Sequence, residues 1–208
     1  RSAGGSDRSL LDIGCGHKPY ARILDNFRYT GMDNFAEKGA QPDLVGSITD
    51  IPLENGAIDA CLTVWVLDDV FEIERAIQEV ARVLKVGGRY YAFENQANYL
   101  HNPPYDYFRF APNALIDMCD RHNLELVQYR SYGGDFANIG FSFIWVSRVF
   151  WRILKLDRVL RPVYSLFINC VFRPLDRFFR LPFWKHKFER NSVGYFYVFE
   201  KISDGTSV

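Results

Sequence analysis

The sequence predicts an α/β protein with a doubly wound sheet of about seven mostly parallel strands and an antiparallel last strand. Short apolar runs that end in glycine or aspartate alternate with segments of helical periodicity, which is typical of such sheets. The 208 residues, 48% hydrophobic and 24% charged, suit one domain with one buried core. About sixty residues before the last strand are too many and too apolar for a loop, which indicates a helical insertion.

The strands and helices follow in chain order. The apolar run 9–13 ends at Gly14, and a helix is expected over 19–26 because Pro19 suits a first helical turn. Apolar residues recur at helical spacing over 71–85, and Pro112 begins another helical pattern over 112–122. The remaining expected strands are 27–32, 43–46, 58–64, 89–94, 124–132 and 193–201.

We expect one domain whose core comprises 9–132 and 193–202, preceded by a flexible lead at 1–8. Residues 133–192 form the helical insertion within the same domain. Over 141–156 the pattern predicts a helix with Arg148, Arg152 and Lys155 on one narrow face, and Pro162 and Pro174 suit the starts of two short helices.

Charge is distributed unevenly, although the net charge is zero. Residues 141–190 hold eleven Lys or Arg and three Asp or Glu, a local charge of +8, together with thirteen of the thirty-four aromatic residues. Three interpretations stay open: helices that complete the core, a homodimer face, or peripheral contact with an anionic membrane at its inner face. Nucleic-acid binding is disfavoured because aromatic residues this dense more often indicate burial.

The four cysteines are widely spaced and lack metal-ligand spacing, so we expect thiols in a reducing cytosol and no metal site. Arg or Lys interrupts each apolar stretch before 18 residues, so we expect no transmembrane helix. These features place the protein in the cytoplasm.

A glycine-rich loop follows the first strand as Asp12-x-Gly14-x-Gly16, which lets a ligand approach the backbone closely. Lys18 occupies the third glycine position of a dinucleotide fingerprint, and Asp12 would repel a phosphate. Asp33 ends the second strand, where it can accept from ribose hydroxyls. A ligand with a ribose and a cationic amino-acid tail fits these residues better than NAD does.

The motifs Leu10-Leu11-Asp12-Ile13-Gly14-Cys15-Gly16, Asp33, Asp50-Ile51-Pro52-Leu53 and Ala81-Arg82-Val83-Leu84-Lys85-Val86-Gly87-Gly88-Arg89 occur in this order. Over about 9–132 the chain thereby resembles the class I S-adenosylmethionine-dependent methyltransferases. Within that family it is similar to the type 11 group, because the first motif continues as Gly16-His17-Lys18-Pro19-Tyr20 and His101 precedes Asp106-Tyr107-Phe108-Arg109-Phe110. Members of this group are often linked with glycan pathways.

The resemblance implies a cofactor site for S-adenosylmethionine, made by residues at the ends of the first four strands. Its expected members are Asp12, Gly14 and Gly16 for the methionine part, Asp33 for the ribose with Asn34 next to it, Ser47 and Ile48 for the adenine, and Trp65 and Val66 for the wall. Three positions depart from the family pattern: Ser47 replaces a frequent acid, Asp68-Asp69 a common Glu-His pair, and Ala111 a frequent Thr.

His101 is the candidate general base, because an imidazole can take a hydroxyl proton at neutral pH; the alternative is a solvated loop residue. Asp68 and Asp69 are candidates for orienting the acceptor. Tyr105, Asp106 and Arg109 either bind the acceptor or pin the loop. The run Asn102-Pro103-Pro104-Tyr105 imitates the motif of DNA adenine methyltransferases, but it follows the fifth expected strand and not the fourth.

We therefore expect a methyltransferase that moves the methyl group of S-adenosylmethionine to an oxygen of a sugar or another small hydroxyl-bearing acceptor. The enzyme would have to align nucleophile, methyl group and leaving sulfur, and exclude water. The alternative is a methyltransferase fold without catalysis that serves as a scaffold recruited to a partner or membrane.

Overall fold

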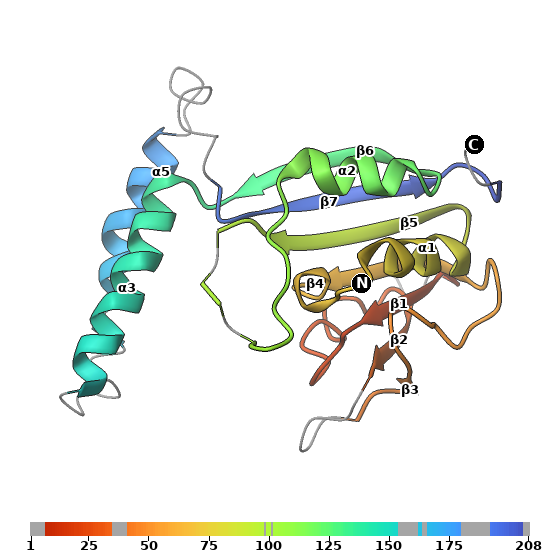
Figure 1. Ribbon diagram of the computed structural model, residues 1–208, viewed down its shortest axis with the longest axis horizontal. Coiled ribbons are helices and arrows are strands. Elements are labelled where there is room, and N and C mark those ends of the chain that lie inside the picture. Colours follow the sequence, from red (N-terminus) through yellow and green to blue (C-terminus); the bar gives the residue numbers. More distant parts are fainter. Residues whose placement is uncertain are drawn as a thin grey trace. The chain divides into compact units, whose positions relative to one another are not determined.

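The computed structural model describes residues 7–34, 41–97, 99–100, 102–153, 162–163, 166–179 and 192–205 (Figure 1). The chain divides into two compact units, and each is described by itself. The sheet unit comprises 1–95, 100–130 and 196–208, and the helical unit comprises 96–99 and 131–195.

Seven strands form one sheet in the order β3-β2-β1-β4-β5-β7-β6. Their bounds are β1 Ser9–Ile13, β2 Arg28–Asp33, β3 Leu44–Val45, β4 Ile58–Val64, β5 Leu84–Asn95, β6 Leu124–Tyr132 and β7 Gly194–Lys201. Strands β1 to β5 pair in parallel, with fully buried Leu11 opposite Thr30 on one side and Cys61 on the other. This order brings the ends of β1, β2 and β4 together, where α/β sheets bind ligands.

Strand β7 runs antiparallel to β6. The N–H of Val193 donates to the carbonyl of Tyr132 (3.1 Å), and the N–H of Ile202 donates to the carbonyl of Asn123 (3.0 Å). The N-terminal end of β7 therefore lies beside the C-terminal end of β6, and the C-terminal end of β7 lies beside the N-terminal end of β6. The predicted fold class, a mostly parallel doubly wound sheet with an antiparallel last strand, is confirmed.

Two helices lie on the same face of the sheet and contact each other (Figure 1). Helix α1 (Ile73–Val83) buries Ile73, Ala76, Ile77, Val80 and Val83, which confirms the helical spacing seen in the sequence. Helix α2 (Pro112–Asp120) has proline in its first turn, as expected, and Ala111 precedes it without a side-chain cap.

The expectation of a helix over 19–26 is wrong, because the structure has a series of turns there. Lys18 adopts a left-handed backbone (φ 54°), and the N–H groups of Ala21 and Ile23 bond to carbonyls only three residues earlier. One bond, from the N–H of Leu24 to the carbonyl of Tyr20, has helical spacing. So short a segment gains too few such bonds to offset the cost of helix nucleation.

Strand β5 begins earlier than expected. Leu84 pairs with Ile58, and the next pair joins Arg89 to Ala60, so residues 85–88 form a bulge that contains Gly87 (φ 79°). The glycine pair therefore interrupts a long strand instead of separating the helix from the strand.

Aromatic side chains from the last strands stack on one another, three of them in the core and Tyr129 half exposed. Tyr90 of β5 lies 6.0 Å from Phe199 of β7, measured between ring centroids, and Phe199 lies 5.7 Å from Tyr197. Tyr197 in turn lies 6.3 Å from Tyr129 of β6. This ladder joins β5, β7 and β6, and stacked rings stabilise a sheet beyond the area they bury.

The helical unit contains α3 (Asp135–Ile153), a π-helical turn η2 (Ile168–Phe172) and α5 (Arg173–Phe179). Helix α3 packs along η2 and α5, and Gly140 permits the contact because a Cβ there would lie 2.9 Å from the ring of Phe172. Helix α3 begins six residues before the expected 141, and 154–161 lie outside the described residues. A search of the described residues finds no helix able to span a membrane.

Candidate functional site

The loop after β1 turns back along β2. The N–H groups of Gly14 and Cys15 both donate to the carbonyl of Met32, at 2.8 and 3.0 Å. Gly14 (φ 71°) and Gly16 (φ 48°) have left-handed backbones, which favour glycine. A Cβ on Gly14 would lie 2.6 Å from Cγ2 of Val66, whereas a Cβ on Gly16 would meet nothing within 4 Å. The backbone at Gly16 is therefore open to a ligand.

Asp33 joins this loop to the end of β2. Its Oδ2 accepts from the N–H of Gly16 at 3.0 Å, and its Oδ1 accepts from the N–H of Asn34 at 2.8 Å. A carboxylate oxygen can accept more than one hydrogen bond, so each Asp33 oxygen retains capacity for a hydroxyl donor. Asp33, expected at a ribose, and Asn34, also expected at the cofactor, are thus brought beside the glycine loop.

Asp12 is buried at the end of β1, with 2% of its surface exposed. Burial is the main cause that raises its pKa to about 6; the hydroxyl of Tyr29, which donates to Oδ2 at 2.5 Å, opposes the rise, and Asp33 adds to it. A cation beside Asp12 would favour its ionised form. The cradle of a buried carboxylate, an open glycine backbone and Asp33 fits a ligand with an ammonium group and a ribose.

Sequence reasoning missed Tyr29. Asp12 pairs with Gly31 across β1 and β2, and Tyr29 lies two residues before Gly31. Because side chains alternate along a strand, Tyr29 lies on the same face as Asp12. Strand alternation was the signal that would have found it.

The segment after β3 is held by polar contacts. The hydroxyls of Ser47 and Thr49 bond to each other at 2.8 Å, and Ile48 between them is buried. Arg82 of α1 donates to the carbonyls of Ile51 (2.8 Å) and Leu53 (2.7 Å). Ser47 and Ile48, expected at the adenine, therefore belong to an ordered segment that α1 anchors.

Trp65 directly follows β4 and is 53% exposed. Its φ of 56° is unusual for a bulky residue, and such strain is often found at functional sites. Its neighbour Val66 lies against Gly14, so the end of β4 meets the glycine loop. The structure brings together the expected wall residues and the loop.

Asp68 and Asp69 lie in a short 3-10 turn, η1 (Leu67–Asp69), but they differ in exposure. Asp68 is fully buried, and its carbonyl accepts from the N–H groups of Tyr107 (2.8 Å) and Phe108 (3.1 Å). Asp69 is half-buried, and its Oδ2 accepts from the Asn102 amide at 2.8 Å. Of the two carboxylates, Asp69 is the less buried, although its Oδ1 is enclosed.

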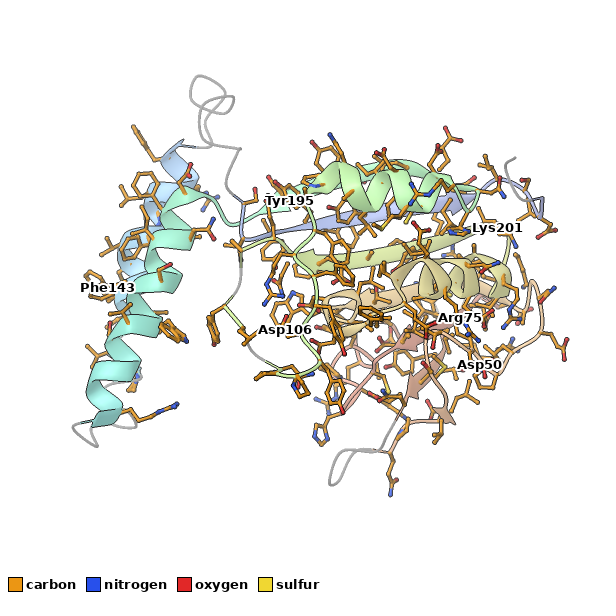
Figure 2. The ribbon with its side chains drawn as sticks, in the orientation of Figure 1. Asp50, Arg75, Asp106, Phe143, Tyr195 and Lys201 are labelled. Atoms are coloured by element: carbon orange, nitrogen blue, oxygen red, sulfur yellow. The ribbon has the colours of Figure 1, made fainter. Side chains whose placement is uncertain are left out.

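Arg109 forms a bidentate ion pair with Asp106. Nη1 lies 2.5 Å from Oδ1 and Nη2 lies 3.0 Å from Oδ2, and the Asp106 side chain is 1% exposed. This partner raises the pKa of Arg109 above its usual value. Figure 2 shows Asp106 on the segment between β5 and α2. The pair pins this segment, and Tyr105 and Tyr107, on the same segment, are exposed.

Glu94 near the end of β5 is a second residue that sequence reasoning missed. It is fully buried; burial, with Asp68 nearby, raises its pKa well above the usual range. Its Oε1 lies 3.4 Å from the hydroxyl of Thr63 and 3.5 Å from the N–H of Leu67. The sequence feature that could have identified Glu94 is an acidic residue within an otherwise apolar strand.

His101, the candidate general base, lies outside the described residues.

Two further features bear on the chemistry. Burial raises the pKa of Cys15 to about 11, which is unsuited to a nucleophilic thiolate. Within the described ranges, no group of three or more His, Cys, Asp or Glu side chains is placed to hold a metal ion.

Residues 11–92 match the family model described as a methyltransferase domain. This match to a methyltransferase domain covers less than half of the chain. The match begins within β1 and ends within β5, so it covers the glycine loop, Asp33, Trp65 and η1. No curated protein matches the chain significantly.

Several solved structures resemble this chain in fold. The complex of the Haloferax volcanii Trm112 methyltransferase activator with a protein assigned as a methyltransferase matches at 18% identity and a TM-score of 0.52, over 64% of this chain and 68% of that one. A Burkholderia thailandensis 1,6-didemethyltoxoflavin-N1-methyltransferase, solved with S-adenosylhomocysteine, matches at 13% identity and a TM-score of 0.51, over 61% and 64%.

The [4+2]-cyclase SpnF matches at 16% identity and a TM-score of 0.57, over 97% of this chain and 78% of that one. These neighbours differ in the reactions that their names state. The fold therefore does not determine the acceptor, which has to be argued from the site.

Proposed function

We propose that this protein is an S-adenosylmethionine-dependent methyltransferase and that it methylates a hydroxyl oxygen of a sugar or a similar small acceptor. The observation that carries the proposal is Asp69, a half-buried carboxylate beyond the carboxyl end of β4 whose Oδ2 accepts from the Asn102 amide. A carboxylate there can accept from an acceptor hydroxyl and orient it. The exposed rings of Tyr105 and Tyr107 suit the apolar faces of a sugar.

The cofactor side is assigned from the geometry of the glycine loop. We propose that ionised Asp12 attracts the ammonium group, that Asp33 and Asn34 hold the ribose, and that the backbone of Gly14 and Gly16 faces the methionine part. A second set completes the pocket: Ser47, Ile48, Trp65 and Val66. S-adenosylmethionine supplies a methyl group already activated by the sulfonium.

An alcohol must lose its proton as its oxygen forms the bond to the methyl carbon, while the carbon–sulfur bond breaks and leaves a neutral thioether. We propose that His101 accepts this proton as the general base. The next residue in the chain, Asn102, donates a hydrogen bond to Asp69. Asp69 orients the hydroxyl, and the Asp106–Arg109 pair keeps the loop in place. Asp68, which is fully buried, acts through the backbone of η1.

The test is release of S-adenosylhomocysteine with two acceptor panels, one of free and nucleotide-linked sugars and one of small amines. Turnover is expected with the sugars. His101→Ala should lower kcat by roughly 10²–10⁴-fold at neutral pH and leave cofactor affinity unchanged, because it removes only the proton acceptor. Asp69→Asn should raise KM, and Asp117→Asn on the exposed surface of α2 is the matched control.

Three results would contradict the proposal in different ways. Turnover with amines alone would reject O-methylation and leave the cofactor site intact. Unchanged turnover in His101→Ala would reject the base. Absence of S-adenosylmethionine binding, measured by calorimetry, would favour a scaffold without catalysis.

A further inference from the structure

Helix α3 presents a stripe of apolar side chains to solvent. Ile139, Phe143 and Val146 recur at spacings of four and three residues and are 50–62% exposed. Figure 2 shows Phe143 among the side chains that stand out from this helix. Residues at such spacing share one face of a helix, so the stripe lies along the middle of α3. Packing among the described residues leaves half or more of each of these side chains exposed.

Other residues of the helical unit also have exposed apolar side chains. Val163, Leu166, Phe167 and Phe178 are 43–65% exposed. The ring of Phe167 lies 5.9 Å from the ring of Phe143, measured between centroids, which joins this group to the stripe on α3. We call this set of seven residues the apolar face. Its size is unusual, since exposed apolar residues normally occur singly on a protein surface.

Basic residues accompany the apolar face. The segment 141–190 carries a net charge of +8, with eleven Lys or Arg against three Asp or Glu. Arg152 near the end of α3 and Arg177, next to Phe178 on α5, are exposed. Helices that combine an apolar face with arginine and lysine on the flanks are typical of binding at an anionic membrane surface.

We propose that the helical unit binds anionic membrane surfaces, with the apolar face entering the boundary between headgroups and acyl chains. Arg152 and Arg177 meet the phosphates, since their long side chains can reach the headgroups while the stem stays apolar. A second copy of the chain fits less well, because dimerisation through this face would bring two segments of +8 together. The proposal does not depend on which acceptor is methylated.

The test is co-sedimentation of the full chain with vesicles of phosphatidylcholine alone or phosphatidylcholine mixed with phosphatidylglycerol. We expect binding to the mixed vesicles that weakens as salt is raised, and little binding to the neutral ones. Val146→Asp should lower the partition coefficient by about tenfold or more, because it places a charge in the apolar face. Arg152→Ala and Arg177→Ala should each lower it by roughly fivefold.

Two control variants match these changes. Val127→Asp introduces the same charge at an exposed valine of β6, and Arg22→Ala removes a positive charge from the sheet unit; both should bind vesicles as the wild type does. Circular dichroism and calorimetric titration with S-adenosylmethionine establish that each variant is folded.

Four results would overturn the proposal. The first two are equal binding to neutral and anionic vesicles, and no binding to either. The third is an equal loss in Val127→Asp. The fourth is a dimer, detected by light scattering, that Val146→Asp dissociates without changing vesicle binding.

Discussion

Asp12 is buried in an environment that disfavours its charge, and its pKa of about 6 lies just below neutral pH. The sign of the effect follows from linkage: a carboxyl whose folded pKa exceeds the unfolded value loses stabilisation as pH rises through the interval from about 4 to about 6. A bound ammonium group would offset that loss, because it lowers the pKa of Asp12 again. The residue therefore favours a cationic ligand.

Affinity for S-adenosylmethionine should rise as Asp12 ionises. If only the ionised form binds the ammonium group, the dissociation constant should fall about tenfold between about pH 5 and about pH 7. Asp12→Asn should bind weakly at both pH values, and calorimetric titration measures all of these constants.

Tyr29→Phe is the informative companion to that experiment. It removes the hydrogen bond that lowers the pKa of Asp12, so the pH at which affinity is half its maximum should move upward. A midpoint that stays in place, or affinity in the wild type that does not depend on pH, would show that Asp12 does not contact the ammonium group.

At the scale of elements, the glycine loop depends on two glycines for different reasons. Gly14 needs its left-handed backbone and also the space beside Val66, whereas Gly16 needs the backbone alone. Gly56, in the turn before β4, has a similar φ of 62° and open space around it. Alanine substitutions at these three positions therefore distinguish the effects of backbone strain, packing and ligand contact.

Gly14→Ala should lower the free energy of unfolding by roughly 2–5 kcal/mol, since strain and overpacking add. Gly16→Ala and Gly56→Ala should each lower it by roughly 1–2 kcal/mol, because they introduce strain alone. Urea denaturation at neutral pH measures these differences.

Cofactor titration distinguishes the two milder variants. Only Gly16→Ala should lose affinity for S-adenosylmethionine, because its Cβ would occupy the open space beside the loop. Equal affinities in Gly16→Ala and Gly56→Ala would place the cofactor elsewhere. In the double variant Gly14→Ala, Val66→Ala, the packing part of the loss should be recovered.

Most strands were predictable because their apolar runs end abruptly: β4 over 58–64 and β6 over 124–132 have the expected bounds. The turns between β1 and β2 were not, because Pro19 gives the same local signal for a helix start and for a turn. Asp33 was placed correctly at the end of a strand, and its bond to the Gly16 N–H depends on how the strands pair. Tyr29 and Glu94 act through tertiary neighbours, which single-residue patterns do not reveal.

For the molecule as a whole, the helical segment leaves and rejoins the sheet at one point. The N–H of Val193 donates to the carbonyl of Tyr132 at 3.1 Å. In a β-hairpin with a two-residue turn, the two residues that flank the turn form the same hydrogen bond. The proposed cofactor residues all belong to the sheet unit. The segment between Tyr132 and Val193 can therefore be replaced by a short turn to test the sheet unit without the helices.

Replacement of residues 133–192 by Asn-Gly should connect β6 to β7 directly, since this pair favours the turn that such hairpins need. The shortened chain should bind S-adenosylmethionine with a dissociation constant within about twofold of the wild type, because the residues that set affinity are retained. It should also lose binding to anionic vesicles, because the apolar face and its arginines are gone. A folded variant with cofactor affinity reduced tenfold or more would show instead that the helical unit contributes to the cofactor site. Calorimetry and co-sedimentation on the same preparation therefore decide whether the two units act separately.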